Sequence, residues 1–206
     1  MLMTDSIEDA KSGLRGLVRK RLAAMTPEER GRLSGAVCER ALAWEPLARA
    51  ASVLAYAPMR SEVDIEPLIQ ALLARGVVVC IPSTDWSGRA ILPVPITDLR
   101  QDLGATERGV RQPRATLQPI ALEEVELFLV PGLAFDALGG RLGRGGGFYD
   151  RVLGNTARRG PALGLAFEAQ VLEHVPMEAH DQRVDALATC ARLIDCRATD
   201  SAGDPG

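Results

Sequence analysis

The chain has 206 residues, of which 47% are hydrophobic and 25% are charged, and its formal net charge is −3. This length and composition predict a globular protein with a substantial core. The weakly acidic balance argues against a nucleic-acid-binding surface, which needs an excess of lysine and arginine, and no apolar run is long enough to cross a bilayer. We expect a monomer without nucleic-acid or membrane partners, with one domain over residues 1–196 and a disordered tail over residues 197–206.

The cysteine pattern and the first residues predict a cytoplasmic protein. No two cysteines form a CxxC pair and the chain has two histidines, so we expect no zinc site. In a reducing compartment the cysteines are expected to remain free thiols, at Cys38, Cys80, Cys190 and Cys196. The N-terminal segment is acidic and lacks an apolar core, which argues against a signal peptide.

Two helices are predicted before the first strand. Apolar residues recur at helical spacing over about Ile7–Leu22. Thr26 is a favourable N-cap and Pro27 suits a first helical turn, so a second helix is expected from there to about Ala43.

The next segment has the pattern of a βαβ crossover. An apolar run at Ser52–Ala57 predicts a strand, Asp64 caps a helix, and Gly76 ends that helix. Val77–Ile81 is β-branched and apolar without alternation, which favours a buried parallel strand. The unit therefore predicts two parallel strands joined by a helix.

The later part of the chain adds strands to the same sheet. Further strands are predicted at Ala90–Ile96, Val125–Val130, Ala162–Phe167 and Asp185–Thr189. The segment Thr97–Leu122 is expected to be rich in loops. The predicted fold class is α/β: a three-layer arrangement with a largely parallel, twisted sheet flanked by helices and preceded by an N-terminal helical segment.

The most informative segment is rich in glycine. Six of the nine residues in Gly139–Gly147 are glycine, with Arg141 and Arg144 among them. A predicted strand enters this segment and a predicted helix, Phe148–Arg158, leaves it. Glycine allows successive backbone N–H groups to face one anion, and arginines suit phosphate oxygens. The segment therefore indicates a polyphosphate site, although glycine is also the usual residue of a flexible turn.

Known nucleotide motifs do not match this loop. A Walker A loop needs lysine followed by serine or threonine, and neither occurs in Gly139–Gly147. The spacing GxGGGF also departs from the dinucleotide pattern GxGxxG at Phe148. Asp150, one helical turn beyond the loop, has the chemistry to hold Mg²⁺ beside phosphates.

Position in the sheet brings a second segment to this site. Ligands of open α/β sheets bind beyond the carboxyl ends of the strands. Both Arg60-Ser61-Glu62 and the glycine loop follow predicted strands, whereas Asp185 would begin its own strand. From the residues alone, Asp185 is equally well interpreted as a strand-start carboxylate, and Lys11 and Arg15 as a solvated helix edge.

One family carries a closely similar pattern. The segment VPGLAFDALGGRLGRGGGFYDR, Val130–Arg151, resembles the VPGxAFD…RLGxGxG[YF]YD signature of the 5-formyltetrahydrofolate cyclo-ligase family, also called methenyltetrahydrofolate synthetase. Weaker landmarks agree in order and spacing over roughly residues 8 to 192. They are Lys11 with Arg15, Glu62-Val63-Asp64, Gly109 with Pro113, and His180-Asp181 through Val184-Asp185-Ala186. Many members have tyrosine in place of Arg144 and Phe148, and glycine in place of Ser61.

The resemblance implies a role for each matched residue. It implies ATP binding by Lys11, Arg15, Arg141, Leu142, Gly143, Arg144, Gly145, Gly146, Gly147, Phe148 and Tyr149. It implies folate binding by Glu62, Arg15, Gly146, Gly147, Phe148 and Tyr149. The Mg²⁺ ligands would be Asp150 and Asp185, and the catalytic residues Arg144 and Arg141.

The implied activity is the ATP- and Mg²⁺-dependent cyclisation of 5-formyltetrahydrofolate to 5,10-methenyltetrahydrofolate, with release of ADP and phosphate. Positioning and charge neutralisation dominate such a reaction, which suits a site built from glycines, arginines and carboxylates. Two alternatives remain from the sequence: a non-catalytic folate-binding or regulatory paralogue, and an unrelated enzyme that handles sugar phosphates.

Overall fold

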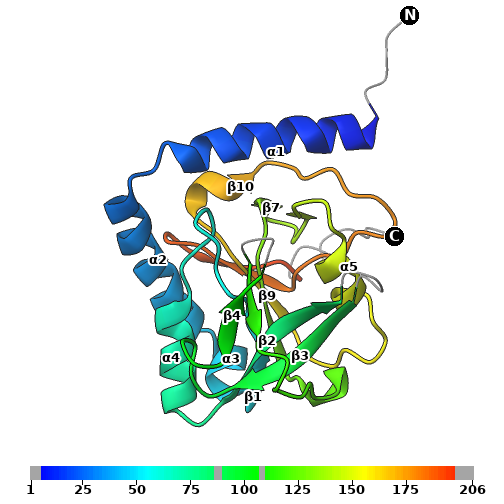
Figure 1. Ribbon diagram of the computed structural model, residues 1–206. Helices are drawn as coiled ribbons and strands as arrows, with labels where there is room; N and C mark the ends of the chain where they lie inside the picture. The colour runs from blue at the N-terminus through cyan, green and yellow to red at the C-terminus, as the bar shows by residue number, and fades with distance from the viewer. Residues whose placement is uncertain (1–5, 86–89, 107–109, 198–206) are drawn as a thin grey trace, which may run out of the picture.

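A seven-stranded sheet of order β12-β11-β9-β6-β1-β2-β3 lies at the centre of the fold (Figure 1). The computed structural model describes residues 6–85, 90–106 and 110–197. The first five residues, Gly109 of the mid-chain landmark and the predicted tail beyond residue 197 lie outside these ranges.

Five strands in the middle of the sheet are parallel, as the sequence predicts. They are β1 (Ser52–Leu54), β2 (Val78–Asp85), β6 (Leu127–Val130), β9 (Ala162–Leu165) and β11 (Ala186–Ala188). The two edge strands, β3 (Ala90–Ile96) and β12 (Leu193–Asp195), are antiparallel to their neighbours. The βαβ crossover is confirmed, because β1 and β2 pair in parallel around an intervening helix.

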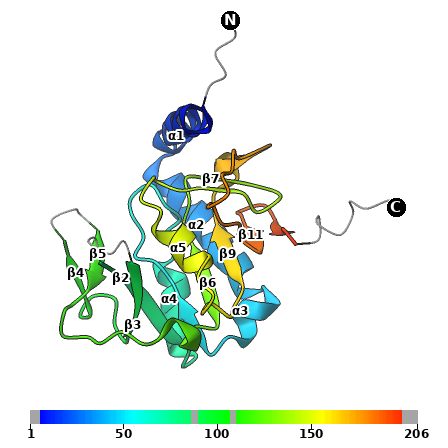
Figure 2. The same cartoon turned by 90° about the vertical axis from the view of Figure 1, so that its right-hand side faces the viewer.

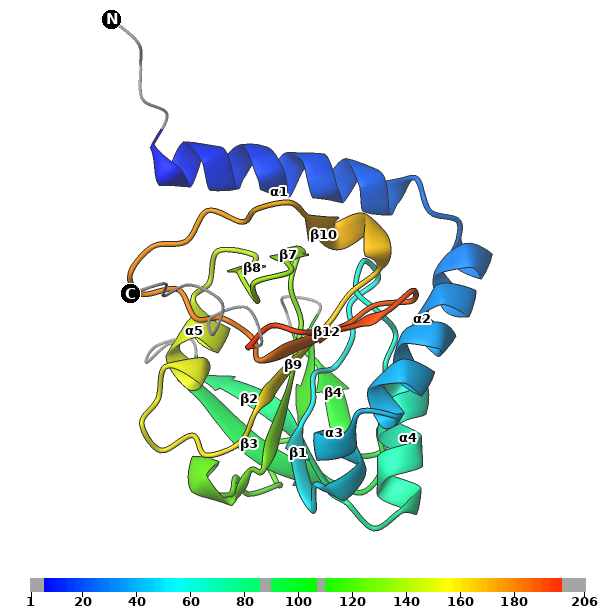
Figure 3. The same ribbon diagram turned by 180° about the vertical axis from the view of Figure 1, so that it is seen from behind.

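Helices cover both faces of this sheet and give the expected three layers (Figures 2 and 3). Successive residues of a strand point to opposite faces, so Val53 joins one apolar cluster and Leu54 the other. The larger cluster lies under α2 (Pro27–Leu42), α3 (Glu45–Arg49) and α4 (Glu66–Ala74). The smaller one lies under α5 (Phe148–Leu153).

Helix α1 (Ile7–Ala23) crosses above the carboxyl ends of the strands (Figure 1). It packs on β7 (Ala134–Asp136) and on the 3-10 turn η2 (Glu168–Gln170). The strand β7 belongs to a small separate sheet with β8 (Arg141–Leu142) and β10 (Val171–Leu172). No pattern in the sequence predicts this sheet, because its strands have only two or three residues.

Several predicted boundaries differ from the structure. The helix expected over Phe148–Arg158 ends at Leu153, where Gly154 caps it and the Arg158 guanidinium donates to the Leu153 carbonyl at 3.1 Å. The segment Thr97–Leu122, expected to be loops, contains a hairpin. Its strands are β4 (Leu103–Ala105) and β5 (Arg111–Pro113), and the 3-10 turn η1 (Leu122–Glu124) follows.

The N-cap of α2 is confirmed, since the Thr26 hydroxyl accepts the Glu29 N–H at 3.1 Å. None of the four cysteines forms a disulfide bond, as predicted. In the described part of the chain, no helix is long and apolar enough to cross a membrane.

Candidate active site

The carboxyl ends of β1 and β6 open into a cavity of about 540 Å³ beneath α1. Its walls come from α1, the loop after β1, the glycine loop and the loop that precedes β11. This is the edge of the sheet at which α/β proteins bind ligands. Segments far apart in the sequence therefore meet at one site.

All but one of the residues to which the family resemblance gives a role line this cavity. They are Lys11, Arg15, Glu62, Arg141, Leu142, Gly143, Arg144, Gly145, Gly146, Gly147, Phe148, Tyr149 and Asp150. The exception is Asp185, which is not among the lining residues.

The glycine loop, residues 143–147, has the backbone of an anion cradle. Gly145 and Gly147 have φ values of +102° and +66°, which favour glycine, and a Cβ on Gly146 would lie 2.8 Å from the Phe148 ring. The backbone N–H groups of Gly145, Gly146 and Gly147 donate to no other residue in the described ranges. The loop thus presents unpaired donors beside the arginines, as a phosphate site requires.

A buried ion pair closes this loop at its base. Arg141 is 5% exposed, and its Nη2 lies 2.6 Å from Asp150 Oδ1. Asp150 Oδ1 also accepts the Gln182 N–H at 3.3 Å. In the described residues, Oδ2 of Asp150 makes no hydrogen bond or ion pair, so this oxygen remains available to a ligand.

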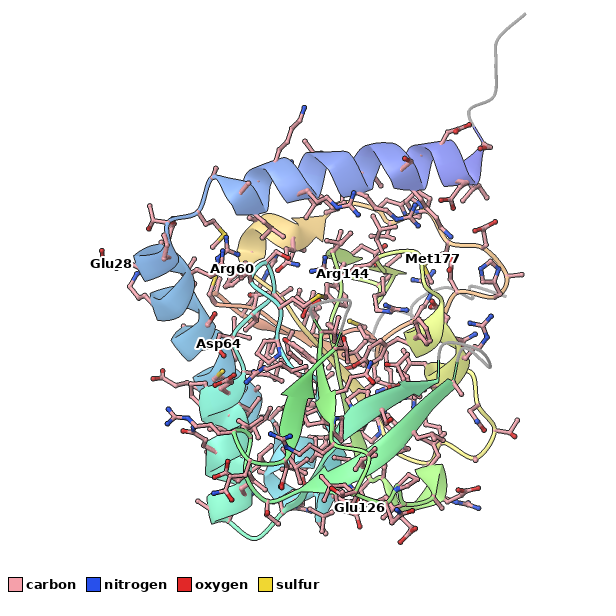
Figure 4. All side chains as sticks on the ribbon, viewed as in Figure 1. Glu28, Arg60, Asp64, Glu126, Arg144 and Met177 are labelled. Atoms are coloured by element: carbon pink, nitrogen blue, oxygen red, sulfur yellow. The ribbon has the colours of Figure 1, made fainter. Side chains whose placement is uncertain are left out.

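A second ion pair crosses the cavity from the glycine loop to the loop after β1. Arg144 Nε lies 3.1 Å from Glu62 Oε1, and Arg144 Nη2 donates to the Ser61 hydroxyl at 2.7 Å. Figure 4 labels Arg144, which lies between α1 and the main sheet. Burial raises the pKa of Glu62 above its usual value, although the Met59 N–H and Arg144 oppose this rise.

Lys11 and Arg15 of α1 line the cavity. Lys11 is 4% exposed, and its Nζ lies 2.7 Å from Glu178 and 2.5 Å from Asp181. Arg15 pairs with Glu8 at 2.7 Å and donates to the Gly143 carbonyl at 3.3 Å. The structure therefore rejects a solvated helix edge for both.

Sequence reasoning missed the acidic partners of Lys11. Asp181 lies in one of the segments that resemble the family pattern, but the resemblance gave it no role in the site. No feature of the sequence pointed to Glu178. Glu178, His180 and Asp181 are near enough to one another to hold a metal ion. The Lys11 ammonium is bound to both carboxylates instead. We therefore assign this group to the placement of Lys11.

Asp185 holds the beginnings of two strands together. Its Oδ2 accepts the Ala162 N–H at 2.7 Å and lies 2.6 Å from Arg158 Nη2. The Arg158 guanidinium in turn lies over the Phe128 ring. These contacts match the strand-start interpretation, and the structure does not bring Asp185 into the cavity with Asp150.

Comparison with known proteins identifies relatives along most of the chain. The family model described as the 5-formyltetrahydrofolate cyclo-ligase family matches residues 7–190. A 5-formyltetrahydrofolate cyclo-ligase of Mus musculus is 29% identical over 191 residues, covering 88% of this chain and 94% of the mouse protein. Another, from Mycolicibacterium smegmatis, is 34% identical over 149 residues, covering 69% of this chain and 75% of that protein.

A solved structure agrees in fold. The NMR structure of Aquifex aeolicus 5,10-methenyltetrahydrofolate synthetase has a TM-score of 0.79 and 32% sequence identity to this chain. The match covers 91% of this chain and 93% of the Aquifex chain. Together with the family model, it spans the cavity from Lys11 to Asp181.

The Lys11 ion pairs predict a defined pH dependence of stability. Burial alone would lower the pKa of Lys11, but Asp181 and Glu178 raise it above 10.5. Burial alone would raise the pKa of Asp181, but Lys11 and the Glu178 N–H hold it below 3.8. Because the carboxyl pKa is lowered on folding, its stabilisation is present above pH 3.8 and is lost as the pH falls further. The lysine contribution is present below pH 10.5 and is lost at higher pH.

We therefore predict that Asp181→Asn lowers the free energy of unfolding by about 2 kcal/mol near neutral pH, because Glu178 remains as a partner of Lys11. Urea denaturation of both proteins should show this difference shrinking below pH 3.8. The control is Glu173→Gln, at an exposed position of the same loop. A loss of stability that is equal at all pH values would contradict the ion-pair assignment.

Proposed function

The chain belongs to the 5-formyltetrahydrofolate cyclo-ligase family, and from this premise we propose that it cyclises 5-formyltetrahydrofolate to 5,10-methenyltetrahydrofolate at the expense of ATP. One observation carries the proposal. A single cavity combines glycine-loop N–H groups that have no partner within the described residues, five basic side chains that include Lys11, Arg15, Arg141 and Arg144, and a buried carboxylate, Glu62. That combination suits a polyphosphate and a polar heterocycle bound side by side.

The ATP phosphates are assigned to the glycine loop and to the basic side chains around it. The backbone N–H groups of Gly145, Gly146 and Gly147 can donate to the phosphate oxygens, and no side chain has to lose its hydration for these contacts. Lys11 and Arg15 approach from α1, on the opposite wall. Leu142, Gly143 and Phe148 complete the lining of this region.

The folate is assigned to the side of the cavity that holds Glu62. This carboxylate is 7% exposed, and Arg144 is its one charged partner among the described residues. A pterin presents ring N–H groups that such a carboxylate can accept. Phe148 and Tyr149 directly follow the glycine loop and also line the cavity, and we assign to them the reacting end of the folate, next to the γ-phosphate.

The chemistry requires two displacements. The N5-formyl oxygen attacks the γ-phosphorus, and ADP leaves with the electrons of the broken P–O bond. N10 then attacks the activated formyl carbon, the C–O bond breaks, and phosphate departs with the former formyl oxygen while N10 loses its proton to water. Arg144 and Arg141 neutralise the charge of the transferring phosphoryl group, and the cavity walls hold the reactants in line.

Mg²⁺ is assigned to Asp150. Asp150 lines the cavity close to the glycine loop, and its Oδ2 has no partner within the described residues. Mg²⁺ binds through one or two carboxylates together with substrate phosphates. When bound, the ion neutralises phosphate charge. The resemblance also implies Asp185 as a ligand, but its carboxylate is engaged by Arg158, so the structure supports Asp150 alone.

The location, oligomeric state and partners that we propose are those expected from the sequence. We propose that the protein acts as a cytoplasmic monomer on a small-molecule substrate, without nucleic acid or membrane. The alternative of a non-catalytic folate-binding paralogue gains no support from the cavity, in which every basic residue expected at the phosphates is present.

The direct test is near-UV absorbance of the purified protein with 5-formyltetrahydrofolate, Mg²⁺ and ATP. We predict a rise of the methenyl chromophore that requires ATP and is accompanied by equimolar ADP. Protein without ATP and protein with a non-hydrolysable ATP analogue are the controls. Folded protein that binds the folate and forms no methenyl product would establish the non-catalytic alternative.

The metal assignment predicts that Asp150→Asn raises the Mg²⁺ concentration for half-maximal rate by roughly tenfold or more, because the amide loses the charge that binds the ion. The amide keeps an oxygen for Arg141, so the variant should remain folded, with a lowered melting temperature because the buried guanidinium loses its counter-charge. Asp185→Asn is the matched comparison, and it should lower the melting temperature without changing the Mg²⁺ dependence. The opposite pattern, with Mg²⁺ dependence shifted only in Asp185→Asn, would refute the assignment.

A further inference from the structure

Two hydrogen-bond donors in the wall of the cavity have no partner. The hydroxyl oxygen of Tyr149 and Nε of Arg141 are buried, and neither makes a hydrogen bond within the described residues. The two side chains are neighbours, since the Arg141 guanidinium lies 5.8 Å from the centre of the Tyr149 ring. Both residues line the cavity.

An unpartnered buried hydroxyl destabilises a folded protein, because it has lost its hydrogen bonds to water without gaining others. The other tyrosine of the chain, Tyr56, avoids this cost because its hydroxyl donates to the Val63 carbonyl at 3.2 Å. Tyr149 has no such arrangement, although its ring packs against the same apolar layer as Phe148. A hydroxyl that is unsatisfied in the free protein and lies at a ligand cavity indicates an acceptor supplied by the ligand.

Tyr149 is close to charged groups from both halves of the site. Glu62, assigned to the folate, and Arg141, assigned to the phosphates, both act electrostatically on Tyr149. A tyrosine hydroxyl carries its proton near neutral pH and can donate it in a hydrogen bond.

We propose that Tyr149 is a catalytic residue whose hydroxyl donates a hydrogen bond to the oxygen that passes from the formyl group to phosphate. This oxygen is the one atom shared by the folate and the phosphoryl group, so it lies where their two sites meet. The inference rests on the proposed function and names a specific acceptor for Tyr149 within it.

The hydrogen bond acts in the second displacement. When N10 closes the ring, the C–O bond breaks and its electron pair leaves on the phosphate oxygen. A neutral donor at this oxygen stabilises the developing charge. The proton remains on Tyr149 throughout, and the proton lost by N10 goes to water, so no further reactant is needed.

The test compares Tyr149→Phe with Tyr56→Phe, two substitutions that each remove one buried hydroxyl. Tyr149→Phe should lower kcat about tenfold to a hundredfold, with KM values for folate and ATP within about threefold. Its melting temperature should be unchanged or raised, since an unsatisfied group is removed. Tyr56→Phe should lower the melting temperature, because it leaves the Val63 carbonyl without its donor, and should leave kcat within about twofold.

Two results would overturn the inference: a Tyr149→Phe protein with wild-type kcat, or one that loses activity and stability together as a structural residue would. Binding of 5-formyltetrahydrofolate in the presence of a non-hydrolysable ATP analogue gives a second readout and should be nearly equal in wild type and Tyr149→Phe. Failure of the proposed function is distinct, because the wild-type protein itself would then form no methenyl product.

Discussion

The buried ion pair between Arg141 and Asp150 is the interaction on which the site depends. Arg141 begins β8 and Asp150 lies in α5, so the pair fixes both ends of the glycine loop. A guanidinium that is almost fully buried cannot lose its carboxylate without a large desolvation penalty. The conformation of the loop, the free oxygen of Asp150 and the position of Tyr149 all follow from this constraint.

The cavity keeps its charges paired in the absence of ligands. Lys11 is bound to two carboxylates, Arg15 to Glu8, and Arg144 to Glu62. Each pair is arranged at the cavity wall, where a phosphate can take the place of a carboxylate partner. Preorganised charges of this kind need little rearrangement when negative charge develops. Among the described residues, the cavity groups without a partner include the N–H groups of the glycine loop, the Tyr149 hydroxyl, Nε of Arg141 and the acceptor Oδ2 of Asp150.

The sequence predicted the sheet and the cradle because both depend on local patterns. Non-alternating apolar runs marked β2 and β6 as buried parallel strands, and the rule for carboxyl ends placed Glu62 beside the glycine loop. The partners of Lys11 were not predictable in this way, since Glu178 is 167 residues away. The pairing of Asp185 with Arg158 was not predictable either. It depends on how two loops meet at the amino ends of β9 and β11, opposite the cavity.

The central claim is that one cavity holds folate and triphosphate so that the formyl oxygen faces the γ-phosphate. A crystal structure with 5-formyltetrahydrofolate and a non-hydrolysable ATP analogue tests this most directly. The account predicts the pterin at Glu62, the γ-phosphate on the N–H groups of the glycine loop, and the Tyr149 hydroxyl within hydrogen-bond distance of the formyl oxygen. Nucleotide bound away from the glycine loop, or folate bound away from Glu62, would contradict it.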